Sequence, residues 1–184
     1  MTGASCPDRV WPLWWSLVAF ACYGAHAVEL VRRYPWSNLL WSCNVAALML
    51  AVALAVGWPR AVAAAAMLLG VGDVFWLLDI KAGGELLVTA PLTHGLSFAL
   101  ALRACRTTGV PPGSWLVATA VMVLATLAAR LAGPASENVN LAFAIPSGYE
   151  KYFPGHAAYL ALNASWIAGA FYAIERLARR GGAR

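Results

Sequence analysis

Residues 38–50 read NLLWSCNVAALML, an apolar run in which the small polar residues Ser42, Cys43 and Asn44 follow one another. The run predicts a helix that enters a membrane, with the polar cluster a few residues inside its first edge. Hydrocarbon cannot satisfy the hydrogen bonds of such side chains, so they must face protein, water or a substrate. What surrounds the cluster is therefore the main functional question.

The composition of the whole chain is that of a membrane protein. Of its 184 residues, 61% are hydrophobic and 11% are charged, whereas soluble domains average about 45–50% apolar and 25% charged residues. Each crossing needs about 20 residues, so this length permits about six spans joined by short connections. We expect an all-α fold, a polytopic transmembrane helix bundle in which residues 1–184 form a single integral membrane domain.

The apolar runs predict spans over residues 11–31, 36–56, 61–78, 86–102, 114–131 and 156–174. The longest connection, residues 133–155, is rich in Asn, Pro, Gly and aromatic residues, and a loop of this length in so compact a protein is a candidate functional lid. Eight Lys and Arg residues lie on the side of the two termini and five on the other side. This bias favours cytoplasmic termini and contact with the lipid bilayer, not nucleic-acid binding.

The polar residues of the spans fall at similar depths, at about 1.5 Å of rise per helical residue. His26 and Glu29 lie near the outer end of the first span, and the residue 42–44 cluster lies near the outer start of the second. Asp73, His94 and His156 lie towards the same side on later spans. Such segregation predicts one shared cavity that opens to the outer face and is roofed by residues 133–155.

Three of these residues have the chemistry of a nucleophilic triad. Cys43 would attack, His94 would take its proton, and Asp73 would orient the imidazole and stabilise its charge. The alternative for Cys43 is a small buried hydrophobic side chain. The other cysteines, Cys6, Cys22 and Cys105, show neither metal-binding nor disulfide spacing, and we expect no special role for them.

A second set of residues is expected to bind substrate: His26, Glu29, Asn44, Asn138, Asn140 and His156. Each also has a structural interpretation. His26 and Glu29 share a helix face and can form an ion pair, the two loop asparagines can cap a helix or hold the loop, and His156 can be an interfacial residue.

Motifs for nucleotide binding, zinc proteolysis and deamination are absent, so no cofactor and no metal is expected. The sequence favours an enzyme acting on a lipid or lipophilic small molecule by Cys-His acyl transfer or hydrolysis. Two alternatives remain. The protein could bind or transport a polar ligand, haem or copper through His26, Glu29, His94 and His156, or it could be a non-catalytic accessory subunit.

The order of these features resembles the YwaF-like integral membrane family, which includes the animal transmembrane ether-lipid acyltransferase. The resemblance covers roughly Asn38 to Phe143 and rests on the helix with a central cysteine, the following span with its acid, and the segments LTHGLSF (92–98) and NVNLAF (138–143). It implies Cys43 as the acyl-accepting thiol, His94 as its base, and Asn138 or Asn140 as part of a polar wall. The chain departs from the family in having Trp41-Ser42 where a histidine usually precedes the cysteine, and in having one span fewer.

Overall fold

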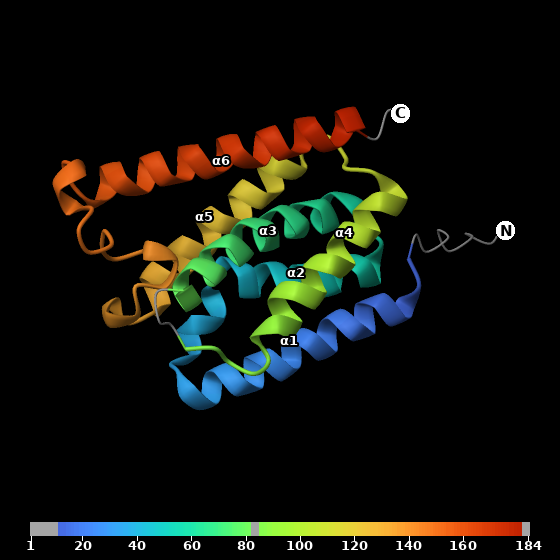
Figure 1. The fold of residues 1–184 in the computed structure, drawn as a ribbon, viewed down its shortest axis with the longest axis horizontal. Coiled ribbons are helices and arrows are strands. Elements are labelled where there is room, and N and C mark those ends of the chain that lie inside the picture. The colour runs from blue at the N-terminus through green and yellow to red at the C-terminus, as the bar shows by residue number, and fades with distance from the viewer. Residues whose placement is uncertain (1–10, 82–84, 182–184) are drawn as a thin grey trace, which may run out of the picture.

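The computed structural model describes residues 11–81 and 85–181, and within these residues the protein is all helical, with six α-helices and no strand. The helices are α1 (Leu13–Arg33), α2 (Ser42–Val56), α3 (Pro59–Lys81), α4 (Ser97–Thr108), α5 (Ser114–Ala132) and α6 (His156–Gly181). Successive helices run in opposite directions, so the start of α1 and the end of α6 lie at the same end of the bundle (Figure 1). The predicted all-α bundle of about six spans is confirmed.

Four of the helices, α1, α3, α5 and α6, are long and apolar enough to cross a membrane, and α2 is a shorter apolar helix. α4 is extended at its start by a π-helical turn, Leu92–Leu96. Large apolar side chains such as Leu124, Leu131 and Leu177 are exposed to the surroundings of the bundle. An apolar exterior of this kind is compatible with an integral membrane protein.

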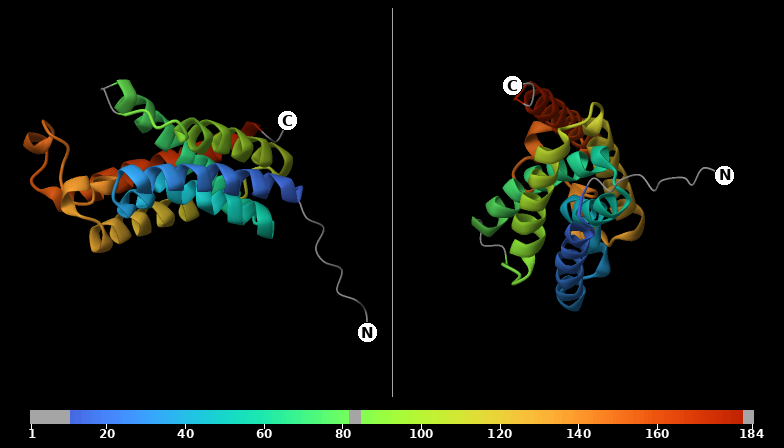
Figure 2. Two further views of the ribbon diagram at one scale, coloured as in Figure 1. Left: turned by 90° about the horizontal axis from the view of Figure 1, so that it is seen from below. Right: turned by 90° about the vertical axis from the view of Figure 1, so that its right-hand side faces the viewer.

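The core of the bundle lies between α2 and α3, which make the most extensive helix contact in the structure. Their facing surfaces are built from small residues, among them Ala47, Ala51, Ala61 and Ala65, all fully buried. Small side chains let two helix backbones approach closely, as is common in membrane bundles. α5 packs on α3, and α6 packs chiefly on α5 along one side of the bundle (Figure 2).

The prediction of one continuous helix over residues 36–56 is wrong. A short 3₁₀-helix, Trp36–Leu40, is followed by a break at Trp41, whose φ and ψ are −52° and 134°, and α2 begins only at Ser42. Side chains take over hydrogen bonds at the break: the Trp41 Nε1–H donates to Asn38 Oδ1 (3.0 Å), and the Asn44 amide donates to the Asn38 carbonyl (3.0 Å). The polar cluster therefore forms the first turn of a helix and does not lie inside one.

Residues 133–155 form the loop that joins α5 to α6 and contain three single 3₁₀ turns, Ala135–Glu137, Val139–Leu141 and Glu150–Tyr152. The second of these turns packs against α5 and against the 3₁₀-helix that precedes α2. The loop is thereby fixed at the end of the bundle where the polar cluster lies.

Candidate functional site

A cavity of about 660 Å³ lies at this end of the bundle, among all of the long helices and the residue 133–155 loop. Its polar lining includes five of the site residues predicted from the sequence, His26, Cys43, Asn44, His94 and Asn140. Ser42, which precedes Cys43, also lines it. α5 and α6 supply much of the apolar lining, including Leu127, Leu160 and Ile167. A volume of this size is in the range of small-molecule binding sites.

His94 is held in a fixed orientation at the start of the fourth helix. Its Nδ1 lies 2.8 Å from Asp73 Oδ1 of α3, and only 4% of the residue is exposed. Because a carboxylate only accepts hydrogen bonds, Nδ1 carries a proton, and Nε2 of the neutral ring is left as an acceptor. The residue lies within the π-helical turn, a feature that is frequent at functional sites in proteins.

Trp76, which lies one turn after Asp73 on α3, covers one face of the same imidazole. The two rings are parallel to within 3°, and their centroids are 4.6 Å apart. The edge of His94 is therefore fixed by a carboxylate and its face by an indole, both from one face of α3.

Cys43 lies on the same cavity wall as His94, close enough to act on the imidazole electrostatically. Among the described residues, Asp73 and not Cys43 is hydrogen-bonded to the ring. A Cβ added to Gly72 would lie 2.9 Å from the Cys43 Cβ, so α3 can approach the cysteine only because residue 72 has no side chain. The structure thus brings together Cys43, His94 and Asp73, the three residues selected for a triad.

Cys43 is also the second residue of α2, where backbone N–H groups have no partner within the helix. The Ser42 N–H donates to Asn140 Oδ1 (2.9 Å), and the Val45 N–H donates to the Trp41 carbonyl (3.0 Å). Within residues 11–81 and 85–181, no acceptor lies in bonding position for the N–H groups of Cys43 and Asn44. Two free donors beside the thiol can stabilise a negative charge that develops there.

Asn44 lines the cavity with a side chain that is only half satisfied. Its Nδ2 donates to the Asn38 carbonyl, and because a carbonyl only accepts, this contact fixes which end of the amide is nitrogen. The remaining Oδ1 is buried and has no partner among the described residues. A buried acceptor without a donor is costly, and it is a direct indication that a ligand or water completes the site.

His26 and Glu29 do not pair directly. Thr89, which precedes the fourth helix, lies between them: its hydroxyl donates to Glu29 Oε2 (2.6 Å) and lies 3.0 Å from His26 Nδ1. Glu29 also accepts the backbone N–H groups of Val88 and Thr89 and pairs with Arg33. Glu29 therefore fixes the start of the fourth helix and does not line the cavity, whereas His26 does.

The two loop asparagines have different surroundings. Asn140 Nδ2 donates to the Leu40 carbonyl (2.7 Å), and its Oδ1 accepts the Ser42 N–H, so it clamps the loop to the helix break. Asn138 bonds only within its own loop, to the backbone of Phe143 and Ala144, and it does not line the cavity. Asn138, Asn140 and Leu141 all have positive φ, between 44° and 58°. Strain of this kind persists only where surrounding contacts hold it.

His156 lies outside the cavity lining as well. Its Nε2 lies 3.0 Å from the Leu141 carbonyl, so it donates there and links the first turn of α6 to the strained part of the loop. Its role in the structure is to hold the loop.

At the rim of the cavity, the side chains of Tyr34 and Glu85 form a polar group with Arg33, the last residue of α1. The Tyr34 hydroxyl donates to Glu85 Oε2 (2.5 Å), and Arg33 pairs with the other oxygen of the same carboxylate. The Tyr34 hydrogen bond, followed by the Arg33 charge, holds the pKa of Glu85 below its ordinary value. The bond to Glu85 also raises the pKa of Tyr34.

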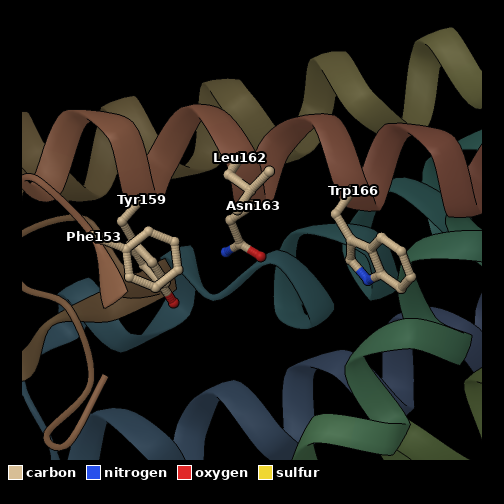
Figure 3. A pocket seen from close by; sticks show the side chains of 5 residues that line it. All are labelled: Phe153, Tyr159, Leu162, Asn163 and Trp166. Atoms are coloured by element: carbon tan, nitrogen blue, oxygen red, sulfur yellow. The ribbon is translucent and has the colours of Figure 1, made fainter. Parts of the chain in front are cut away.

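A smaller pocket of about 220 Å³ lies on α6, lined by Phe153, Tyr159, Leu162, Asn163 and Trp166. Tyr159, Asn163 and Trp166 project from α6 towards the rest of the bundle (Figure 3). Asn163 also lines the large cavity, so the two spaces adjoin at α6.

The described residues contain no group of three or more His, Cys, Asp or Glu side chains that could hold a metal ion. Cys22 and Cys105 are free thiols away from the cavity lining, and Cys6 lies outside the described residues. Comparisons with protein families, curated proteins and solved structures find no match to this chain. The function must therefore be inferred from the geometry of the site.

Three residues of the site were not selected from the sequence. Trp76 resembles the other interfacial tryptophans, and Gly72 is one of many small residues in the spans. Thr89 falls in a predicted span without any charged neighbour in sequence. A tryptophan three residues after an intramembrane aspartate was the one available signal, because that spacing places both on one helix face.

Proposed function

We propose that the protein is an integral membrane enzyme that transfers or hydrolyses the acyl group of a lipid ester through Cys43, His94 and Asp73. The observation that carries the proposal is the 2.8 Å contact between His94 Nδ1 and Asp73, with Cys43 beside the same ring on the wall of a large cavity. An oriented base next to a nucleophile is the arrangement that covalent catalysis requires. The same residues carry the resemblance to the YwaF-like family.

The first half of the reaction forms an acyl-enzyme. The Cys43 thiol gives its proton to His94 Nε2, and the sulfur attacks the ester carbonyl carbon. The carbonyl oxygen gains negative charge beside the N–H groups of Cys43 and Asn44, which are available to stabilise it. The carbon–oxygen bond of the ester then breaks, His94 returns the proton to the departing alcohol, and Cys43 is left as a thioester.

The second half returns the enzyme to its starting state. Water or a second alcohol gives its proton to His94 and attacks the thioester carbon, and the sulfur leaves and recovers the proton. Asp73 keeps the imidazole in the required tautomer and stabilises its charged form throughout. Trp76 keeps the ring plane fixed.

The decisive experiment uses full-length protein in lipid nanodiscs and an activated long-chain ester, such as the p-nitrophenyl ester of a fatty acid with an alkyne tag. Covalent labelling of the wild-type protein, with the added acyl mass on Cys43, is expected. Cys43→Ala should abolish labelling, while Cys22→Ala and Cys105→Ala, which change thiols outside the cavity lining, should keep it. His94→Gln should slow labelling about 10²–10⁴-fold.

Persistent labelling of a folded Cys43→Ala protein would contradict the proposal. A wild-type protein that binds lipid esters without ever forming a thioester would favour a binding or transport protein. If substitutions at Cys43 and His94 changed only thermal stability, a non-catalytic accessory subunit would be the better description.

We further propose that both termini are cytoplasmic, because Lys and Arg are more numerous on their side of the bundle. The cavity would then open at the outer leaflet. Labelling of single introduced cysteines by a membrane-impermeant reagent in intact cells tests this: a cysteine at Tyr149, an exposed loop residue, should react, and one at Thr108 should not.

A further inference from the structure

Two residues that line the cavity, His26 and Asn44, each have a hydrogen-bond acceptor without a donor among the described residues. The first is His26, which is 4% exposed. The Thr89 hydroxyl proton is directed at the Glu29 carboxylate, which can only accept, so the Thr89 oxygen must accept from His26 Nδ1–H. The neutral ring then has a lone pair on Nε2, and no protein group in the described chain donates to it.

The second acceptor is Asn44 Oδ1, on a side chain that is 3% exposed. Its orientation is fixed by the bond from Nδ2 to the Asn38 carbonyl. Asn44 comes from α2 and His26 from α1, and different networks fix them, so they are independent observations. Both indicate a ligand that offers hydrogen-bond donors.

The charge of the lining indicates what the ligand lacks. Among the described residues, no Lys or Arg lines the cavity, and Glu85 at its rim is a carboxylate. Arg33, which does not line the cavity, is already paired with Glu29 and Glu85. A phosphate or free carboxylate held among the lining residues would therefore find no free cation to pair with, which is unfavourable away from water. The part of the cavity wall that α5 and α6 form is mostly apolar.

We propose that the cavity binds an uncharged lipid with free hydroxyl groups, of the monoacylglycerol class. Two hydroxyl protons are donated to His26 Nε2 and Asn44 Oδ1, and the acyl chain lies along the apolar wall of α5 and α6. The choice of a monoacyl ester as substrate rests on the proposed function, because its carbonyl would then lie beside Cys43. The recognition of hydroxyl groups by His26 and Asn44 does not depend on catalysis.

The test measures binding to the Cys43→Ala protein in nanodiscs, so that no turnover occurs. Three ligands with the same acyl chain are compared: the monoacylglycerol, its dimethyl ether, which has lost both hydroxyl protons, and the lysophosphatidic acid, which is anionic. The monoacylglycerol should bind at least about tenfold more tightly than either of the others. The dimethyl ether leaves the two buried acceptors unpaired, and the lysophosphatidic acid buries an unpaired charge. Equal or tighter binding of the ether or of the anionic lipid would overturn the proposal.

A matched pair of variants tests the role of His26. Thr89→Val keeps the shape of residue 89 but removes the oxygen that fixes the His26 tautomer. Thr93→Val, one turn later, is the control, because the Thr93 hydroxyl is buried and has no partner in the described structure. Thr89→Val should weaken binding of the monoacylglycerol several-fold and leave binding of the dimethyl ether unchanged, while Thr93→Val should change neither. A Thr89→Val protein with wild-type selectivity would contradict the proposal.

The chain has only three histidines, so nitrogen NMR of labelled protein gives a readout without any ligand. His26 should be the Nδ1–H tautomer in the wild-type protein and a mixture of tautomers in Thr89→Val. A mixed wild-type signal would count against the assignment.

Failure of this proposal can be distinguished from failure of the proposed function. Acyl labelling of Cys43 without hydroxyl selectivity removes only this proposal, whereas hydroxyl selectivity without an acyl-enzyme removes only the proposed function.

Discussion

The indole of Trp76 lies flat against the imidazole of His94, with ring centroids 4.6 Å apart and an angle of 3° between the planes. Asp73, the hydrogen-bond partner of His94, lies three residues before Trp76 on α3, so the two share one face of the helix. Asp73 holds the edge of the imidazole, and Trp76 holds its face. The second ring nitrogen of His94 is thereby held in one place relative to α2. This geometry has a measurable consequence for the proposed chemistry.

Trp76→Leu should slow acylation of Cys43 because the imidazole loses the surface that fixes its plane. Aromatic stacking contributes about 0.5–1.5 kcal/mol, so we expect a decrease of about two- to tenfold in the rate of thioester formation. Trp76→Phe, which keeps a ring, should retain most of the rate. The measurement is intact mass against time; equal rates for Leu and Phe would show that stacking does not position the base.

Gly72→Ala should displace the cysteine without removing it. The added Cβ would lie 2.9 Å from the Cys43 Cβ, closer than real contacts allow, so α2 or the side chain must shift. Overpacking of this kind costs about 1–3 kcal/mol of stability, and we expect the acylation rate to fall by more than the stability loss explains. Gly169→Ala, where nothing lies within 4 Å of the added atom, is the control. If Gly72→Ala were labelled at the wild-type rate, the thiol would not need the close approach of α3.

The sequence predicts the bundle because apolar runs and their breaks are local signals. It also predicts which polar residues share a depth, since alternating helices place the end of α3 beside the starts of α2 and α4. Depth alone predicts that Cys43, Asp73 and His94 lie together. The structure places Asp73 and His94 in hydrogen-bonding contact and Cys43 on the same cavity wall as His94.

What the sequence could not predict depends on contacts between distant residues. The break at Trp41 exists because Asn140, 98 residues after Ser42, takes the first N–H of α2. The link between His26 and Glu29 runs through Thr89, 63 residues after His26. Neither residue has a local pattern that reveals its partner. Spacing alone therefore left an ion pair between His26 and Glu29 open beside a functional role for them, and loop hydrogen bonding by Asn140 open beside a substrate contact.

Asn140→Gly should loosen the loop and the start of α2 together. The two bonds from Asn140 to Leu40 and Ser42 would be lost, at a cost of about 1–3 kcal/mol, while glycine still permits the positive φ of 53°. Protease sensitivity of residues 133–155 should rise, and acylation of Cys43 should slow because the helix start is no longer fixed. Asn138→Gly, which loses only bonds within the loop, should raise protease sensitivity without slowing acylation. If both variants slowed acylation equally, the clamp would have no special role.

Tyr34→Phe should change how stability depends on pH. The hydrogen bond from Tyr34, followed by the charge of Arg33, lowers the pKa of Glu85 in the folded protein. A folded-state pKa below the unfolded value means that the carboxylate stabilises the fold above the unfolded pKa, and that this contribution disappears as the pH falls through the folded pKa.

The difference in melting temperature between wild-type protein and Tyr34→Phe should therefore be largest near neutral pH and should narrow as the pH falls into the range where carboxylates are protonated, about 4 and below. The effect should be small, since Glu85 is half exposed and its ion pair with Arg33 is screened by water. Tyr149→Phe, at an exposed loop position, should show no such dependence. Thermal unfolding in nanodiscs from pH 7 to pH 3.5 makes the comparison, and a difference that grows towards acid pH would mean that Tyr34 does not stabilise the charged form of Glu85.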